Sequence, residues 1–214
     1  MKPVRGVKLI VFDMDGVLVD IDSSWMMVHR AFGVDNEASF QRYVRGEISF
    51  EEFMRSDIGL WKGRRLSEVK EVLDRAPLMP GAEETVKRLK DAGYQTAIIS
   101  SGISLLAERV QTQLSIDHVL ANKILAEGDR LTGEGEAVVE LGRKLEALKR
   151  LTGELGLKPY QCAVVGDSRW DAPMFRVSAL SIAFNPKDEE AARAADFIVK
   201  GKNLKGVLAY LLEG

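Results

Sequence analysis

Short apolar runs and longer amphipathic segments alternate along most of the chain. The apolar runs have the length of buried strands and fall at 7–12, 94–99, 118–121, 161–165, 180–184 and 197–199. The amphipathic segments between them predict helices at 82–92, 103–114, 141–155, 172–177 and 204–212. Strands that alternate with helices predict an α/β fold, with a Rossmann-like, doubly wound and mainly parallel sheet covered by helices on both faces.

The segment 20–78 breaks this alternation, because its spacing is helical throughout and predicts no strand. Asp22-Ser23-Ser24 can cap a helix that ends at Gly33, and Ser49 with Glu52 has the pattern of a capping box before a later helix. Asp22 therefore has two possible roles, as a helix cap or as a group that faces a ligand.

The length of this segment suggests an inserted domain. A strand, its crossover helix and the return strand normally need about 30 residues, whereas more than 80 separate the first two strands here. We expect a core domain of residues 1–19 and 79–214 and a small helical cap domain of residues 20–78, inserted after the first strand over the carboxyl edge of the sheet. A β-hairpin is also predicted around Glu127-Gly128-Asp129.

Composition excludes several classes of protein and partner. Of 214 residues, 46% are apolar, enough for a sizeable core, and no apolar stretch approaches the length of a membrane span. The net charge of −2 gives no reason to expect a nucleic-acid or anionic-membrane partner. The single cysteine, Cys162, excludes an internal disulfide and fits a reducing compartment, so a cytoplasmic protein is expected.

Polar side chains follow three of the predicted strands at the point where each strand ends. Asp13 and Asp15 follow the first, Ser100-Ser101-Gly102 the second, and Gly166-Asp167 with Asp171 a later one; Lys144 and Lys149 occupy the helix before it. Ligands of open α/β sheets bind at the carboxyl ends of the strands. Carboxylates for a hard cation, hydroxyl and amide donors, and a lysine together predict a phosphate site with a metal ion.

These motifs resemble those of the haloacid dehalogenase superfamily of phosphohydrolases. The chain has Asp13-Met14-Asp15-Gly16-Val17-Leu18 for the first motif, Ser100 for the second, Lys144 for the third, with Lys149 the less favoured choice, and Gly166-Asp167-Ser168-Arg169-Trp170-Asp171 for the fourth. All four occur in order, and the resemblance covers essentially the whole chain.

The resemblance implies a Mg²⁺-dependent phosphatase that forms an aspartyl-phosphate. It assigns the nucleophile to Asp13 and the general acid and base to Asp15. Mg²⁺ would be held by Asp13, Asp167 and the backbone carbonyl of Asp15, with Asp171 beside it or bound to it. The phosphoryl oxygens would contact Ser100, the amides near Ser101 and Gly102, and Lys144.

Within the superfamily the chain is most similar to phosphoserine phosphatases, and its departures fall in the expected specificity pocket. Asp22 stands where those enzymes have a glutamate for the substrate amine. Asp57 stands where they have an arginine for the substrate carboxylate, with Arg55 two residues earlier. A carboxylate binds a carboxylate poorly, so we expect the charge of the specificity pocket to be reversed relative to those enzymes. Trp170 replaces a small residue and would line or crowd the pocket.

Three functions remain open from the sequence. The first is a phosphatase that acts on a small-molecule phosphate ester as a monomer or homodimer. The second is a phosphomutase, which uses the same aspartyl-phosphate and returns the phosphoryl group to the substrate. The third is a non-catalytic phosphate-binding module, which the complete set of motif residues disfavours.

Overall fold

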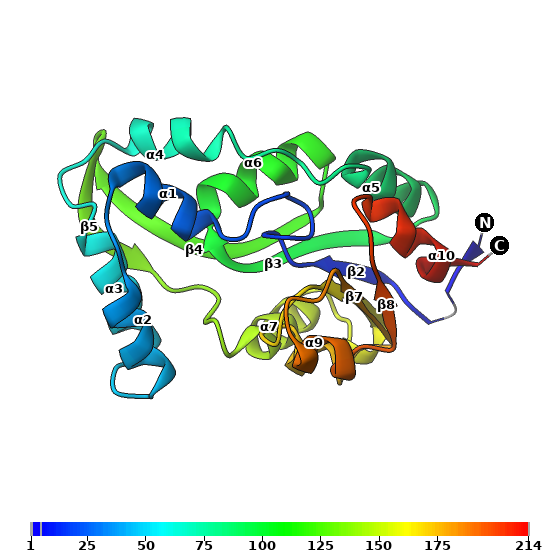
Figure 1. The fold of residues 1–214 in the computed structure, drawn as a ribbon. Helices are drawn as coiled ribbons and strands as arrows, with labels where there is room; N and C mark the ends of the chain where they lie inside the picture. The colour runs from blue at the N-terminus through cyan, green and yellow to red at the C-terminus, as the bar shows by residue number, and fades with distance from the viewer. Residues whose placement is uncertain (1, 5, 214) are drawn as a thin grey trace.

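A seven-stranded sheet runs through the middle of the molecule in this computed structural model, which describes residues 2–4 and 6–213 (Figure 1). The strand order is β5-β4-β3-β2-β6-β7-β8, and β5 is antiparallel to β4 while the other neighbours are parallel. The strands are β2 Leu9–Phe12, β3 Gln95–Ile103, β4 His118–Glu127, β5 Arg130–Glu136, β6 Cys162–Gly166, β7 Leu180–Phe184 and β8 Phe197–Val199. This confirms the predicted mainly parallel α/β fold.

Strand β2 is the central strand because all four of its residues are apolar and fully buried. It pairs with β3 on one side and with β6 on the other. The strands that follow β2 in the chain therefore extend the sheet first on the β3 side and then, from β6 onward, on the opposite side. The carboxyl end of β2 is therefore the switch point of the sheet, where the ends of neighbouring strands leave room for a ligand.

Helices cover both faces of the sheet and bury two separate apolar clusters (Figure 1). One face carries α5 Ala82–Asp91, α6 Ser104–Leu114 and the C-terminal turns η2 Leu204–Val207 and α10 Leu208–Leu211. The other carries α7 Lys144–Glu154, α8 Ala172–Phe175 and α9 Glu189–Ala194. No helix in the described part of the chain is long and apolar enough to cross a membrane.

Residues 20–78, called the helical block below, contain helices and no strand of the sheet, as the sequence predicts, apart from isolated bridges. Its helices are α1 Ser24–Phe32, α2 Glu37–Val44, α3 Phe50–Gly59 and α4 Leu66–Leu73. The capping box of Ser49 and Glu52 is present, and Gly33 ends α1 in the left-handed conformation. Within the predicted capping segment Asp22-Ser23-Ser24, Ser23 caps α1 by accepting the hydrogen bond from the Met26 amide, so of the two roles open to Asp22 the structure excludes that of the cap.

The β4–β5 hairpin packs against this helical block. Strand β4 continues past its predicted end at residue 121 into the hairpin, which contacts α3 and the α3–α4 loop. The amide of Gly63 donates to the Leu131 carbonyl and the Leu131 amide to the Arg64 carbonyl, each at 2.9 Å. Asp129, at the hairpin tip, accepts hydrogen bonds from the amide and hydroxyl of Ser67. Core and helical block are thus joined through the hairpin as well as through the chain at residues 20 and 78.

Other elements differ from the prediction at their ends. Strand β3 extends through Ser100, Ser101 and Gly102, which were expected after the strand. Helix α9 and the small pairing of β1 Lys2–Pro3 with β9 Leu212–Glu213 were not predicted. Such short elements have too few residues for a clear hydrophobic period.

Candidate active site

A cavity of about 430 Å³ lies at the carboxyl end of β2, between the sheet and the helical block. It is lined from the core by the ends of β2, β3 and β6 and from the helical block by α1, α2 and α3. The lining residues are Asp13, Asp15, Asp22, Ser23, Trp25, Met26, Asp35, Asn36, Glu37, Phe40, Phe50, Phe53, Met54, Asp57, Ser100, Ser101, Gly102, Leu141, Lys144, Asp167, Ser168, Trp170 and Lys187.

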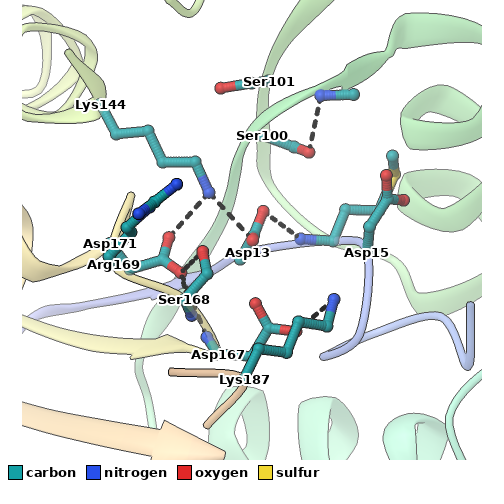
Figure 2. Close-up of polar contacts among 12 residues, drawn as sticks. Asp13, Asp15, Ser100, Ser101, Lys144, Asp167, Ser168, Arg169, Asp171 and Lys187 are labelled. Carbon is teal, nitrogen blue, oxygen red and sulfur yellow. Dashed lines mark hydrogen bonds and ion pairs between the residues drawn. The ribbon is translucent and has the colours of Figure 1, made fainter. Parts of the chain in front are cut away.

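Lys144 joins two of the predicted carboxylates (Figure 2). Its Nζ lies 2.9 Å from Oδ2 of Asp13 and 2.7 Å from Oδ1 of Asp171, and all three residues are buried. Burial favours the neutral amine, but the two carboxylates outweigh it and raise the pKa of Lys144. Lys149, by contrast, is exposed on α7, so the structure brings Lys144 and not Lys149 into the site.

The Asp171 side chain is hydrogen-bonded to the loop after β6. Its Oδ2 accepts hydrogen bonds of 3.1 Å from the Asp167 amide and from the amide and hydroxyl of Ser168. Asp171 is fully buried and does not line the cavity. Its position therefore fits a residue that orients Asp167 and Lys144.

Lys187 is a site residue that sequence reasoning missed. Its Nζ lies 2.8 Å from Oδ2 of Asp167 (Figure 2). The same Nζ donates to the backbone carbonyl of Asp22 at 3.2 Å. Lys187 follows β7, so another polar residue just beyond a strand end was the available signal. Gly16 allows this close approach, because a Cβ there would lie 2.0 Å from Oδ2 of Asp167 and its φ is +85°.

Asp15 has one engaged and one free oxygen. Its Oδ2 accepts hydrogen bonds from the amide and the hydroxyl of Ser24, at 2.7 and 2.8 Å, while Oδ1 is buried without a partner among the described residues. Burial raises the pKa of Asp15 despite the Ser24 hydrogen bonds, which favours the protonated carboxyl. A buried carboxyl with one unengaged oxygen can give a proton to a leaving group.

The end of β3 supplies two hydroxyls at the cavity. Ser100 Oγ accepts a hydrogen bond from the Gly102 amide at 3.0 Å, and Ser24 Oγ accepts one from the Ile103 amide at 3.2 Å. Ser101 Oγ is buried and has no partner among the described residues. Gly102 has no space for a side chain, since a Cβ would lie 2.7 Å from Ser24 Oγ.

Three carboxylates are arranged for a cation. Asp13, Asp167 and Asp171 each place an oxygen within 4.8 Å of the others, and all are buried. Burial is the main reason that the pKa values of Asp13 and Asp167 are raised, with the neighbouring carboxylates adding to it. The lysines Lys144 and Lys187 balance two of the three charges. The oxygen donors and the remaining negative charge therefore fit a hard divalent cation.

A hydrogen-bonded network surrounds Asp57 at the other end of the cavity. Asp57 is 2% exposed, and its carboxylate accepts hydrogen bonds from Asn36 at 2.7 Å, from His29 Nε2 at 3.2 Å and from Ser39 at 3.3 Å. The indole of Trp61 donates to Nδ1 of His29 at 3.1 Å. Asp57 thus lines the cavity and, through its carboxylate, connects several parts of the helical block by hydrogen bonds.

The other predicted specificity residues divide into two groups. Asp22 and Trp170 line the cavity as expected, and the guanidinium of Arg169 lies over the Trp170 ring at 4.7 Å. Arg55 does not line the cavity; it is exposed and pairs with Glu134 of the hairpin at 3.0 Å. Arg55 lies on α3 two residues from Asp57, and that spacing points it to a different face of the helix.

The chain is similar in sequence to known hydrolases. Residues 7–178 match the family model of haloacid dehalogenase-like hydrolases. A phosphoserine phosphatase of Archaeoglobus fulgidus is 33% identical over 210 residues, which are 97% of this chain but 60% of that protein. A phosphoserine phosphatase of Idiomarina loihiensis is 35% identical over 208 residues, 95% of this chain and 93% of that protein.

The fold is similar to that of solved phosphoserine phosphatases. One structure, described as a phospho-aspartyl intermediate analogue of phosphoserine phosphatase, superimposes with a TM-score of 0.82 at 29% identity and covers 96% of this chain and 99% of that one. A substrate-bound phosphoserine phosphatase complex gives the same TM-score and identity. These matches confirm the resemblance that the four motifs indicate.

Proposed function

Since the chain belongs to the haloacid dehalogenase-like hydrolases, we propose that it hydrolyses a small-molecule phosphate monoester through a phosphorylated Asp13. The observation that carries this proposal is the pairing of Asp13 with Lys144 beside a carboxyl, Asp15, whose Oδ1 is unengaged. Nucleophile, positive charge and proton donor meet at one cavity, and they are the groups that phosphoryl transfer needs.

Each residue has a role that follows from its contacts. Asp13 Oδ1 accepts from the Met14 amide at 2.7 Å and Oδ2 lies against Lys144, which fixes the carboxylate for attack on phosphorus. Asp15 protonates the departing alkoxide and then removes a proton from the water that cleaves the aspartyl-phosphate. Lys144 and Ser100 bind phosphoryl oxygens whose charge grows in the transition state.

We propose that the cation is Mg²⁺, held by Asp13, Asp167 and the backbone carbonyl of Asp15, with Asp171 orienting the loop. Mg²⁺ would neutralise phosphoryl charge and draw down the raised pKa values of Asp13 and Asp167. We also propose the domain division 1–19 and 79–214 for the core and 20–78 for the cap. The single cysteine, Cys162, is buried and free, which supports a cytoplasmic location.

The proposal is tested with p-nitrophenyl phosphate and a phosphoenzyme assay. The wild type should hydrolyse this ester with Mg²⁺, and Asp15→Asn should accumulate a protein one phosphoryl group heavier, with the label on the peptide that contains Asp13. Asp20→Asn, an exposed carboxylate on the same segment, serves as the matched control. A wild type that turns over without any phosphorylation of Asp13 would refute the mechanism.

A further inference from the structure

The charges that line the cavity differ between its two ends. At the core end, the carboxylates of Asp13, Asp15 and Asp167 alternate with the ammonium groups of Lys144 and Lys187. At the helical-block end, every ionisable lining residue is acidic: Asp22, Asp35, Glu37 and Asp57. No lysine, arginine or histidine of the described residues 20–78 lines the cavity. An anionic group on the alcohol side of a substrate would therefore meet like charges, and no cationic side chain, from the helical block.

Asp57 is a buried carboxylate without a cationic partner. Its hydrogen-bond donors Asn36 and Ser39 are neutral. The third donor is His29, whose Nδ1 accepts a hydrogen bond from the Trp61 indole, so that Nε2 is the ring nitrogen that donates to Asp57. No described lysine or arginine forms an ion pair with Asp57 within 4 Å. Burying a charge is costly unless a countercharge accompanies it, so this site favours a cationic ligand.

Aromatic rings complete the same end of the cavity. Trp25, Phe40 and Phe53 line the cavity from the helical block, and Trp170 lines it from the loop after β6. The Trp25 ring is held in place by a 2.9 Å hydrogen bond from its indole to the Ser101 carbonyl. Ammonium groups bind favourably over the faces of such rings. The Ser101 carbonyl that accepts the bond from Trp25 belongs to the end of β3, and the Ser101 hydroxyl is buried, lines the cavity and has no partner among the described residues, so a hydrogen-bonding ligand would satisfy it.

We propose, on the basis of the phosphatase function above, that this cavity selects phosphate monoesters whose alcohol carries an ammonium group and no carboxylate. The phosphoryl group is held at the core end by Lys144 and Ser100. The ammonium lies at the other end, close to Asp57 and Glu37 and against the aromatic rings. Ethanolamine phosphate and choline phosphate have this chemistry, whereas phosphoserine adds a carboxylate that the acidic wall repels.

The experiment compares kcat/KM for O-phosphoethanolamine, phosphocholine, O-phosphoserine and glycerol 1-phosphate, with p-nitrophenyl phosphate as the reporter of phosphoryl chemistry. We expect at least one ammonium ester to exceed both phosphoserine and glycerol 1-phosphate by about tenfold or more. Phosphoserine turned over as well as the ammonium esters, or better, would overturn the proposal. Loss of p-nitrophenyl phosphate hydrolysis alone would count against the phosphatase function and leave the selectivity to be decided by binding.

Binding gives that second readout. Calorimetric titration of Asp13→Asn with O-phosphoethanolamine and with O-phosphoserine, both with Mg²⁺, should show tighter binding of the former, and equal or reversed affinities would overturn the proposal. Glu37→Gln and Asp57→Asn should each reduce the ratio of the affinity for O-phosphoethanolamine to the affinity for O-phosphoserine by roughly five- to tenfold. Glu37 is exposed, so its substitution keeps the test valid if Asp57→Asn fails to fold. Glu71→Gln, an exposed acid of α4 outside the cavity, should leave the preference unchanged.

Discussion

The two ends of the cavity stabilise buried carboxylates in different ways. At the core end, Asp13 and Asp171 are paired directly with Lys144, and Asp167 with Lys187. At the helical-block end, called the cap end from here on, the Asp57 carboxylate accepts hydrogen bonds from Asn36 and His29 and pairs with no lysine or arginine among the described residues. At the core end, Lys144 and Lys187 thus supply the positive charge that the carboxylates need, and the reaction there is the same for every substrate. At the cap end, the negative charge of Asp57 is left for a ligand to balance. Substitutions at the two ends should consequently affect different kinetic parameters.

The largest effect is expected for Asp13→Asn. An amide cannot attack phosphorus, so kcat should fall to background for every ester while the fold is kept, because the substitution is isosteric. Circular dichroism and thermal unfolding provide the control for folding. Substantial activity in this variant would show that the core end does not work through Asp13.

Removal of divalent cations should abolish activity almost as completely. Excess EDTA should stop turnover and added Mg²⁺ should restore it, because Asp13 and Asp167 then lose the charge that offsets their repulsion. A readout independent of activity is the melting temperature, which Mg²⁺ should raise in the wild type but much less in Asp167→Asn. Turnover that persists in excess EDTA would contradict the metal assignment.

Lys144→Ala should lower kcat by about 10²–10³-fold, as expected for the loss of one preorganised donor to the phosphoryl oxygens. It should also destabilise the protein, because Asp13 and Asp171 remain buried without their partner. The matched control is Lys149→Ala, which removes an exposed lysine from the same helix and should change neither property. If Lys149→Ala lowered kcat and Lys144→Ala did not, Lys149 would be the lysine that binds the phosphoryl group.

His29→Ala should act on the stability of the cap end. It leaves the indole N–H of Trp61 buried without an acceptor and removes a donor from Asp57, so the free energy of unfolding should fall by about 1–3 kcal/mol. Chemical denaturation measures this change. The control is His118→Ala, a half-buried residue at the start of β4, which should cost less. Equal losses would argue against the network around Asp57.

Arg55→Ala should have the smallest effect. Its ion pair with Glu134 is exposed and worth about 0–1 kcal/mol, and Arg55 lies outside the cavity. The values of kcat/KM for phosphoserine and ethanolamine phosphate should both stay unchanged. A selective loss with phosphoserine would show that Arg55 reaches the substrate and would weaken the contrast between the two ends.

The core end was predictable from the sequence because its signals are local. An apolar run followed by Asp13 and Asp15 places both acids at the end of a buried strand whatever surrounds it, and Ser100 and Asp167 follow in the same way. The family match confirms the resemblance that these motifs carry. The extension of β3 through Gly102 escaped prediction because Ser and Gly are typical of turns. The structure continues the strand across an irregularity after Ile99, and the pairing with β4 resumes at Ile103.

The cap end could not be read in the same way. The sequence placed Asp57 in the expected specificity pocket, but its hydrogen-bond partners Asn36 and His29 come from other parts of the helical block. Asp57 stood at the expected position and Arg55 two residues earlier, and only the helix in its tertiary setting shows that Asp57 lines the cavity while Arg55 pairs with Glu134 of the hairpin. Lys187 reaches Asp167 from 20 residues further along the chain.

By itself the sequence determined the α/β fold, the helical segment between the first two strands of the sheet and the residues that we propose for phosphoryl transfer, since hydrophobic periodicity and strand-end motifs act within a few residues. Tertiary structure alone decided which lysine meets Asp13, that Lys187 joins the site, and that Asp57 is buried without a cation. Those properties depend on distances and burial between elements remote in sequence, and electrostatic energies depend on both.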